Sequence, residues 1–448
     1  MERFEDQEGI DMLKKSKYAF FIKKDSRYYI VYSSLTGTVV VFDEDMFINK
    51  LIRIIENETI EDDLDEEVIS VLKSKKILID ENTNEDILVR TIYEENIVRS
   101  TSVIELMLIV TKQCNFRCIY CGQPHENRRM SWQVYESIIM FIKTEIPKYS
   151  YKKIKVTFFG GEPLLEYDNI VCFLSKIKEL SAEVQIEYEA GMSTNGYLLT
   201  PQKYDLLESL NCNSFQISID GMDYTHDKTR PLVDGGCTWQ RIIDNIKYMT
   251  TTDRYFSVTL RTNFNIDVAE SMIELYDYIQ CNLNDKRIHI YYETIKDQGN
   301  KDTPRILSAV EGMMLNIDLT RIVRERDLDC INTTIRTKPC SMICYASKPN
   351  FYIIDEDGAL KKCSYDLNVP DNYIGELKAD GTTEIDFERY GKWVYSDYLS
   401  LKACKKCKAL PLCLGKRCPR NLAVPDKKMQ CNTDIIENEI EGMIKAYY

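Results

Sequence analysis

The chain has 448 residues, a length that allows roughly two to four domains. With 44% hydrophobic and 29% charged residues, it has the composition of a globular protein rather than of a disordered chain. Its formal net charge of −13 repels phosphate backbones, which argues against nucleic acid as a partner. The unusual feature is a content of 16 cysteines beside only 3 histidines.

The N-terminal segment MERFEDQEGI carries charges from its second residue and has no apolar core of a secretory signal. No stretch approaches the roughly 20 apolar residues of a membrane span. We therefore expect a cytoplasmic protein without a membrane partner, whose cysteines are reduced thiols rather than disulfides.

Residues 18–42 contain three β-type runs, YAFFIKK, YYIVYSS and TVVVF, which predict a small three-stranded sheet. Phe47, Leu51, Ile54 and Ile55 recur at helical spacing, and a short helix over 68–75 and a brief strand ILI follow. The first predicted domain, residues 1–95, is thus a βββαα unit of winged-helix-like size. The acidic, Asn-rich segment 81–96 is predicted to be a linker.

Strands are next predicted at about 104–111, 154–159, 185–192, 214–219, 256–264 and 287–294. Helical segments at about 131–146, 166–181, 201–211, 238–252 and 267–281 alternate with them, which is typical of a parallel α/β sheet or barrel. Six strands are too few for a full eight-stranded barrel, so a partial (β/α)6 barrel, TIM-like in its rhythm, is predicted over 96–325. Chemistry in such a fold lies at the carboxyl ends of the strands.

The β/α rhythm stops near residue 330, and nine of the 16 cysteines lie beyond that point. Residues 326–448 are therefore predicted to form a third, cysteine-organised domain. Five cysteines lack any partner spacing and are expected to be buried as small apolar side chains: Cys172, Cys212, Cys237, Cys281 and Cys330.

The first barrel strand is followed directly by Cys114, Cys118 and Cys121, spaced by three and then two residues. Three thiolates on one short loop can hold three irons of a [4Fe–4S] cube and leave the fourth iron open for a small molecule. A zinc site is the alternative, with His125 close by, but this is not a zinc-finger spacing.

This spacing, with Tyr120 just before the third cysteine, resembles the radical S-adenosylmethionine (radical SAM) superfamily. The resemblance implies that the open iron is chelated by the amino and carboxylate groups of SAM. It also implies an enzyme that cleaves SAM to a 5′-deoxyadenosyl radical, which abstracts hydrogen.

Further motifs follow in the order that the resemblance implies. Glycines after the second strand permit close backbone approach, and a carboxylate beside them can receive an ammonium group, so this motif is expected to hold the SAM amino group. Small polar residues at the ends of the third and fourth strands suit a ribose and a carboxylate. The expected SAM contacts are Gly160, Gly161, Glu162, Pro163, Ser193, Asn195, Ser218 and Arg230. His226 is expected to be structural, the roles of Arg261 and Asn263 stay open, and no catalytic side chain is identified.

Eight of the late cysteines can make two sets of four, each suited to a closed [4Fe–4S] cluster or, alternatively, to zinc. Their arrangement resembles the SPASM domain that follows many radical SAM barrels. The resemblance implies one auxiliary cluster on Cys340, Cys344, Cys363 and Cys418, and a second on Cys404, Cys407, Cys413 and Cys431. Together with the barrel cluster this makes three [4Fe–4S] clusters. Four residues, LGKR, separate Cys413 from Cys418 where the family usually has three, and Cys340 is the least well-defined ligand.

The N-terminal unit resembles, in fold pattern, the PqqD-like domain of ribosomal peptide maturases, which binds a leader peptide at a sheet edge; TVVVF would be that edge. The three resemblances predict a radical SAM/SPASM maturase that forms an intramolecular thioether in a ribosomal precursor peptide. They also imply an electron donor of the flavodoxin or ferredoxin kind. Carbon–carbon crosslinking, epimerisation and anaerobic sulfatase maturation are the alternative activities, the last weakened because Ser364 rather than an aspartate follows Cys363.

Overall fold

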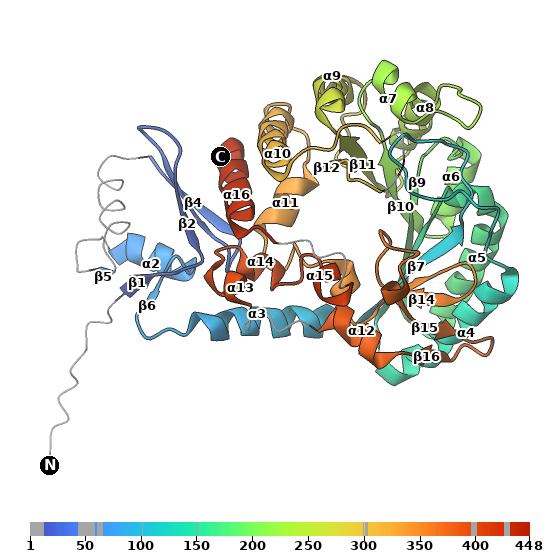
Figure 1. Ribbon diagram of the computed structural model, residues 1–448, viewed down its shortest axis with the longest axis horizontal. Coiled ribbons are helices and arrows are strands. Elements are labelled where there is room, and N and C mark those ends of the chain that lie inside the picture. The colour runs from blue at the N-terminus through green and yellow to red at the C-terminus, as the bar shows by residue number, and fades with distance from the viewer. Residues whose placement is uncertain are drawn as a thin grey trace, which may run out of the picture.

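The computed structural model describes residues 13–43, 59–60, 66–100, 102–149, 151–298, 300, 303–395, 401–424 and 431–448. Its largest element is a ten-stranded sheet with the order β12-β11-β10-β9-β8-β7-β13-β14-β15-β16. The first six strands of that order form the curved barrel at the right of Figure 1, with helices on its outer side.

The six barrel strands are mutually parallel and lie within a few residues of their predicted positions. They are β7 (Val103–Thr111), β8 (Lys153–Gly160), β9 (Glu187–Thr194), β10 (Cys212–Ser218), β11 (Ser257–Phe264) and β12 (Ile288–Thr294). The helices between them are α4 (Trp132–Tyr149), α5 (Tyr167–Glu183), α6 (Pro201–Ser209), α7 (Asp223–Thr229), α8 (Trp239–Thr250) and α9 (Ile266–Asn282). The prediction of a partial six-stranded α/β barrel is confirmed.

Alternation along the strands separates the core from the inner face of the barrel. In β11, Val258, Leu260 and Phe264 are buried in the main apolar core that the helices share. Arg261 and Asn263 point to the other face and are half-buried. The strand therefore presents polar groups to the concave side because successive side chains leave a strand on opposite faces.

The cysteine-rich region continues the barrel sheet. Strand β13 (Phe351–Ile354) pairs in parallel with β7, and β14 (Ala359–Lys361), β15 (Tyr373–Leu377) and β16 (Thr383–Ile385) follow as antiparallel neighbours. The helices of this half are α10 (Ala309–Glu325), α11 (Ile331–Thr337), α12 (Phe387–Val394), α13 (Lys402–Lys406), α14 (Leu410–Cys413), α15 (Arg420–Ala423) and α16 (Thr433–Tyr447). The C-terminal region thus extends the barrel sheet from its first strand, β7.

The predicted N-terminal three-stranded sheet is present as β2 (Ala19–Lys23), β3 (Tyr29–Ser33) and β4 (Thr38–Phe42), in that order. A second small sheet joins β1 (Leu13–Lys15) to β5 (Thr59–Ile60) and β6 (Leu78–Asp80), with α2 (Glu66–Ser74) beside it. The helix predicted around Phe47–Ile55 lies outside the described residues. The linker predicted over 81–96 is wrong for most of its length, because α3 (Glu85–Ser100) occupies it.

The N-terminal sheet packs on the cysteine-rich half of the described chain. Phe20, Ile22 and Ile30 share an apolar cluster with Leu412 and Ile440. The Tyr32 hydroxyl donates a hydrogen bond of 2.6 Å to the carbonyl of Thr337 in α11. Figure 1 shows this sheet beside α16, with α3 passing under α13 and α14 toward α12.

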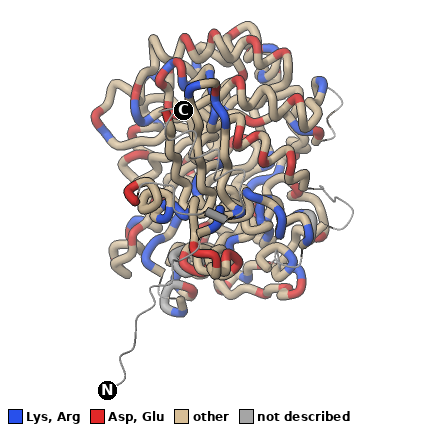
Figure 2. Tube along the Cα trace, turned by 90° about the vertical axis from the view of Figure 1, so that its left-hand side faces the viewer, with Lys and Arg blue, Asp and Glu red and all other residues tan. Residues whose placement is uncertain are grey.

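Acidic and basic segments are interspersed over the face that carries the N-terminal sheets, as Figure 2 shows. No helix in the described part of the chain combines the length and the apolar character that a membrane crossing requires.

Candidate functional site

The cysteine loop lies directly after β7, at the carboxyl end of the first barrel strand. The N–H of Arg117 donates to the carbonyl of Pro231 at 2.9 Å, and the N–H of Ile119 donates to that of Thr229 at 3.0 Å. Backbone hydrogen bonds to the segment after α7 therefore fix the loop between Cys114 and Cys121.

The three thiols of this loop are half-buried, and their charges affect the pKa values of Cys114 and Cys118. Burial raises the pKa of Cys114 to about 12, and the charges of Cys118 and Cys121 raise it further. Burial also raises the pKa of Cys118 to about 11, again with a contribution from Cys121. Thiols in such surroundings stay protonated unless a cationic group binds them, which fits an iron–sulfur ligand set.

His125 is the other metal-binding side chain near the loop, and its Nε2 lies 3.9 Å from the Sγ of Cys121. Among the described residues, however, no three His, Cys, Asp or Glu side chains converge as ligands of one metal ion.

Gly160 and Gly161 let the end of β8 pass close to the cysteine loop. A Cβ on Gly160, whose φ is 140°, would lie 2.2 Å from the carbonyl oxygen of Thr111. A Cβ on Gly161 would lie 2.0 Å from the carbonyl oxygen of Gln113, just before Cys114. Neither position can carry a side chain without moving the backbone that leads into the cysteines.

Glu162 is fully buried, and its carboxylate joins the ends of two strands. It accepts hydrogen bonds from the Thr194 hydroxyl at 2.7 Å, the Asn195 N–H at 2.7 Å and the Leu164 N–H at 2.9 Å. Burial raises the pKa of Glu162, and these hydrogen bonds oppose that shift. The residue expected to receive the SAM ammonium group thus already ties β8 to β9, while Pro163 starts a short 3-10 turn behind it.

The other expected SAM contacts lie along the same end of the barrel. The Asn195 side-chain N–H donates to Oδ1 of Asn115 at 2.8 Å, inside the cysteine loop. Ser193 accepts a hydrogen bond of 3.0 Å from Gln216, and Ser218 lies beside Arg261 in the β10–β11 register.

A buried hydrogen-bonded hub is centred on the Tyr120 hydroxyl. This hydroxyl donates to Oδ2 of Asp220 at 2.5 Å and accepts from Arg230 at 2.7 Å and from Asn263 at 3.1 Å. The N–H of Asn263 also donates to Oδ1 of Asp220 at 2.9 Å. Arg230, expected beside the SAM carboxylate, thus hydrogen-bonds the cysteine loop through Tyr120.

His226 completes the hub as a structural residue. It is fully buried, and its Nδ1 accepts the N–H of Asp220 at 3.1 Å. From the sequence, the role of Asn263 stayed open and Asp220 was assigned none. The signal that pointed to them was their position, because both follow or end parallel strands whose carboxyl ends meet.

A segment after β12 covers the third cysteine and was not predicted as part of the site. Gln298 accepts the N–H of Gly122 at 3.1 Å through Oε1, and the side chain of Asn300 donates to the carbonyl of Cys121 at 3.0 Å. These amides carry no motif that a sequence could reveal.

Three thiols of the first C-terminal set interact electrostatically. Burial raises the pKa of Cys344 to about 11, and the charges of Cys363 and Cys418 add to the shift. Burial alone raises the pKa of Cys340 to about 11, and Cys340 packs in a separate apolar cluster with Tyr18 and Leu410.

The thiols of the second C-terminal set influence one another's pKa values. Burial raises the pKa of Cys413 to about 11, and the charges of Cys404 and Cys431 contribute to the shift. The pKa of Cys407 is raised by burial and then by Cys413 and Cys431. These four thiols are the ones predicted to share the second auxiliary cluster.

The remaining five cysteines were expected to be buried, and this is wrong for three of them. Cys212 and Cys330 are buried, whereas Cys172, Cys237 and Cys281 are exposed. Cys172 and Cys281 lie on α5 and α9, whose outer faces are in solvent, so a helical cysteine without a partner need not be a core residue.

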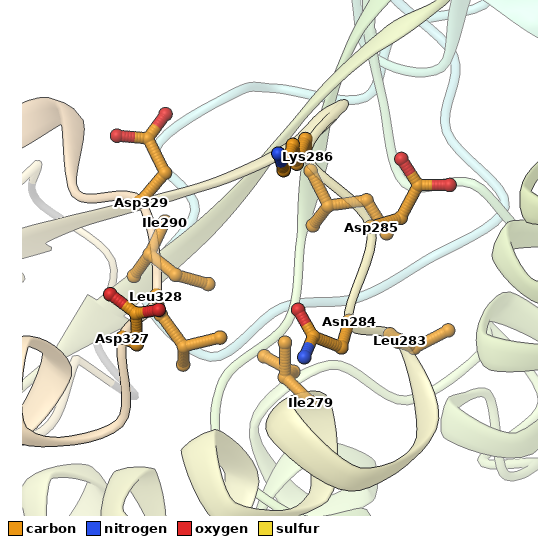
Figure 3. Close-up of a pocket in the computed structure, with 10 residues that line it drawn as sticks. Ile279, Leu283, Asn284, Asp285, Lys286, Ile290, Asp327, Leu328 and Asp329 are labelled. Carbon is orange, nitrogen blue, oxygen red and sulfur yellow. The ribbon is translucent and has the colours of Figure 1, made fainter.

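A cavity of about 260 Å³ is lined by none of the cysteines. Ile279 of α9 and Leu283, just after that helix, line it together with Ile288 and Ile290 of β12, and Asp327 and Asp329 stand at its rim (Figure 3). Because Ile288 begins β12, this cavity is at the amino end of the barrel strands, opposite to the cysteine loop.

Residues 108–279 match the family model described as the radical SAM superfamily. This part of the chain, which holds the three-cysteine loop and the Tyr120 hub, is therefore similar to radical SAM domains.

Two curated relatives illustrate the range of the similarity. A GTP 3′,8-cyclase of Campylobacter jejuni is 33% identical over 176 residues, which cover 38% of this chain and 51% of the relative. The radical SAM cyclopropyl synthase TigE of Paramaledivibacter caminithermalis is 25% identical over 285 residues, covering 56% of this chain and 58% of the relative. The chain spans about half the length of the curated relatives it matches.

Two solved structures share the fold. The enzyme anSMEcpe, solved with AdoMet and a peptide, matches with a TM-score of 0.61 and 16% identity over 77% of this chain and 97% of its own. Streptococcus suis SuiB, solved with its precursor peptide SuiA, matches with a TM-score of 0.50 and 15% identity over 90% of this chain and 94% of its own. At these identities the likeness concerns the fold.

Proposed function

We propose that this protein is a radical SAM peptide maturase that forms an intramolecular thioether between a cysteine sulfur and a carbon of a ribosomal precursor peptide. One observation carries the proposal: a small N-terminal sheet with an open edge strand packs on the cysteine-rich region. That region in turn continues the sheet of the radical SAM barrel. SuiB was solved with its precursor peptide, which supports a peptide substrate for a chain of this fold.

The peptide would bind at β4. Within the described residues β4 pairs with β3 alone, so its outer backbone groups are available to an added strand. Val41 of β4 is 45% exposed, which offers an apolar contact beside that edge. This edge is the leader site that we expect.

The cofactors would be held by two kinds of residue. Cys114, Cys118 and Cys121 would hold the cluster that binds SAM, and the strand-end residues expected from the sequence would line SAM itself. The two C-terminal thiol sets would hold auxiliary clusters, giving three [4Fe–4S] clusters in all. When bound, SAM and its cluster would supply the radical chemistry that removes a hydrogen atom from the peptide.

Formation of the carbon–sulfur bond leaves one further electron that must be removed from the peptide. One hydrogen atom leaves the peptide carbon for 5′-deoxyadenosine, and the cysteine thiol loses its proton as the carbon–sulfur bond forms. The remaining electron must leave the peptide, and an auxiliary cluster is the acceptor that we propose. Burial alone raises the pKa of Cys340, and this residue packs beside Tyr18, which supports a first set with only three protein thiolates and room for a substrate sulfur.

Anaerobic sulfatase maturation is the alternative that the likeness to anSMEcpe favours. Its expected aspartate has no counterpart directly after Cys363, and Asp366 is buried and engaged by Arg420, whose NH2 donates to Oδ1 at 3.1 Å. A carboxylate held in this way is poorly placed to accept a proton from a substrate. We therefore favour thioether formation.

Two measurements test the proposal. Anaerobic reconstitution should load about twelve irons, four per cluster, and yield 5′-deoxyadenosine from SAM. Coexpression with a cysteine-rich precursor peptide should lower the peptide mass by two hydrogens per link, and each link should remove one cysteine from alkylation after reduction. Mass loss with every cysteine still alkylated would indicate carbon–carbon crosslinking. An unchanged mass with deuterium uptake from heavy water would indicate epimerisation.

A further inference from the structure

The cysteine-rich half carries exposed cations around its second thiol set. The chain places seven basic residues near these cysteines, but two of them face inward: Lys416 is 3% exposed, and Arg420 pairs with the buried Asp366. The others are exposed and are called here the α13 basic surface: Lys402, Lys405, Lys406, Lys408 and Arg417.

Among the described residues, the α13 basic surface has no carboxylate partners. None of its five side chains forms an ion pair there, although eleven other lysines of the described chain do so, such as Lys153 with Glu189. Five clustered cations make this surface locally positive on a protein with a net charge of −13. Such a surface attracts an acidic macromolecule and accelerates its encounter.

The surface is also next to the C-terminal thiol set that has an exposed member. Cys431 is exposed, Cys404 and Cys413 are half-buried and Cys407 is buried, whereas the first set has no exposed member. The charge of Arg417 lowers the pKa of Cys413 against the larger effect of burial, so this cation lies within electrostatic reach of the thiol. Figure 1 shows α13, α14 and α15 between the N-terminal sheets and barrel strand β7.

We infer that the α13 basic surface docks an acidic one-electron carrier protein of the flavodoxin class. The inference rests on the proposed function, because that reaction needs a reductant for SAM. Across the interface the carrier loses one electron and this protein gains one, and no group or proton has to pass with it. The thiol set at Cys404, Cys407, Cys413 and Cys431 is the part of the protein nearest to the docked carrier.

The test compares two triple variants of the reconstituted enzyme. The first is Lys402→Glu, Lys405→Glu and Lys406→Glu. The control is Lys143→Glu, Lys152→Glu and Lys176→Glu, which reverses three exposed lysines of the barrel half that form no ion pair in the described residues. Binding of purified flavodoxin is measured at low and at high salt, together with the iron content of each variant.

We expect the α13 variant to bind flavodoxin about tenfold or more weakly at low salt and to lose most of the salt dependence of binding. The control should bind as wild type does, and all three proteins should hold the same iron. SAM cleavage driven by dithionite should be equal in all three, whereas cleavage driven by reduced flavodoxin should fall in the α13 variant alone.

Three outcomes would overturn the inference. Equal flavodoxin binding in the two variants would show an ordinary solvated surface. Weakened binding of the precursor peptide with unchanged flavodoxin binding would assign the surface to the substrate. Loss of flavodoxin binding in the control as well would show a nonspecific charge effect. Failure of dithionite-driven cleavage in the wild type would instead count against the proposed function, while the binding comparison would still stand.

Discussion

The Nζ of Lys416 donates a hydrogen bond of 2.6 Å to the hydroxyl of Tyr93, across 323 positions of sequence. Tyr93 belongs to α3, which leads out of the N-terminal sheets, and Lys416 belongs to the spacer between Cys413 and Cys418. The backbone of Lys416 donates to the carbonyl of Cys413 at 2.7 Å and accepts the N–H of Cys344 at 3.0 Å. One residue therefore connects α3 to both C-terminal thiol sets.

This connection explains the long spacer LGKR. Leu414 and Gly415 adopt left-handed backbone angles, with φ values of 51° and 68°, and so turn the chain before Lys416. The turn places Lys416 in the interior, where its ammonium group also donates to the carbonyl of Val394 at 2.9 Å.

A double-mutant cycle tests this link. The free energies of unfolding of Tyr93→Phe, Lys416→Met and the double variant should reveal a coupling of about 1 kcal/mol, because both single variants remove the same hydrogen bond. Chemical denaturation under anaerobic conditions is the measurement. The matched cycle of Tyr93→Phe with the exposed neighbour Arg417→Met should be additive, and equal coupling in both cycles would refute the link.

The Tyr120 hydroxyl should be needed to seat the cysteine loop. Tyr120→Phe leaves Asp220, Arg230 and Asn263 without their common partner in a buried place, which should cost about 1–3 kcal/mol of stability. We also expect weaker SAM binding, measured by equilibrium dialysis of the reconstituted enzyme.

Tyr135→Phe is the matched control for that experiment. Among the described residues, the buried Tyr135 hydroxyl has no hydrogen-bond partner, so its removal should be neutral or slightly stabilising. If Tyr120→Phe behaves like Tyr135→Phe in both stability and SAM affinity, the hub has no positioning role.

Iron content should distinguish Cys340 from Cys344. Cys344→Ala should lose about four irons per chain after reconstitution, because Cys344 interacts with Cys363 and Cys418. Cys340→Ala should retain the wild-type content, since its thiol stands apart from that set. Iron and sulfide analysis is the measurement, and a loss of four irons in Cys340→Ala would make Cys340 a ligand.

Glu293 should contribute stability that disappears in acid. Burial by itself raises the pKa of Glu293, but the charges of Lys296, Arg336 and Arg261 lower it to about 2. Because the folded-state pKa is depressed, the unfolded chain binds the proton first as the pH falls. The stabilising effect is therefore complete above the unfolded value of 4.5 and is lost between about 4.5 and 2.

The comparison of wild type with Glu293→Gln isolates this contribution. The difference in their unfolding free energies should be constant above pH 5.5, amount to at most about 3 kcal/mol, and shrink as the pH falls below 4.5. Denaturation of the metal-free proteins across pH 3 to 8 is the measurement. A difference that does not change with pH would show that the carboxylate charge is not stabilised by its surroundings.

The predicted barrel strands illustrate what local sequence can determine. Alternating apolar residues in β8 and β11 marked both strands within a few residues, because side-chain direction along a strand has a period of two. Helix α3 was missed because the acidic, Asn-rich segment has no apolar stripe, and its partners lie in α14 and at Lys416, far along the chain.

The sequence alone predicted the chemistry that we propose for this protein, since the spacing of Cys114, Cys118 and Cys121 after a strand is a local property of one short loop. It could also count eight late cysteines as two sets. The tertiary structure decided which residues meet: Tyr120 with Asp220, Arg230 and Asn263, and Glu162 with Thr194 and Asn195. The physical reason is that these contacts depend on the register of parallel strands and on the packing of segments 20 to more than 100 residues apart, about which no single segment carries information.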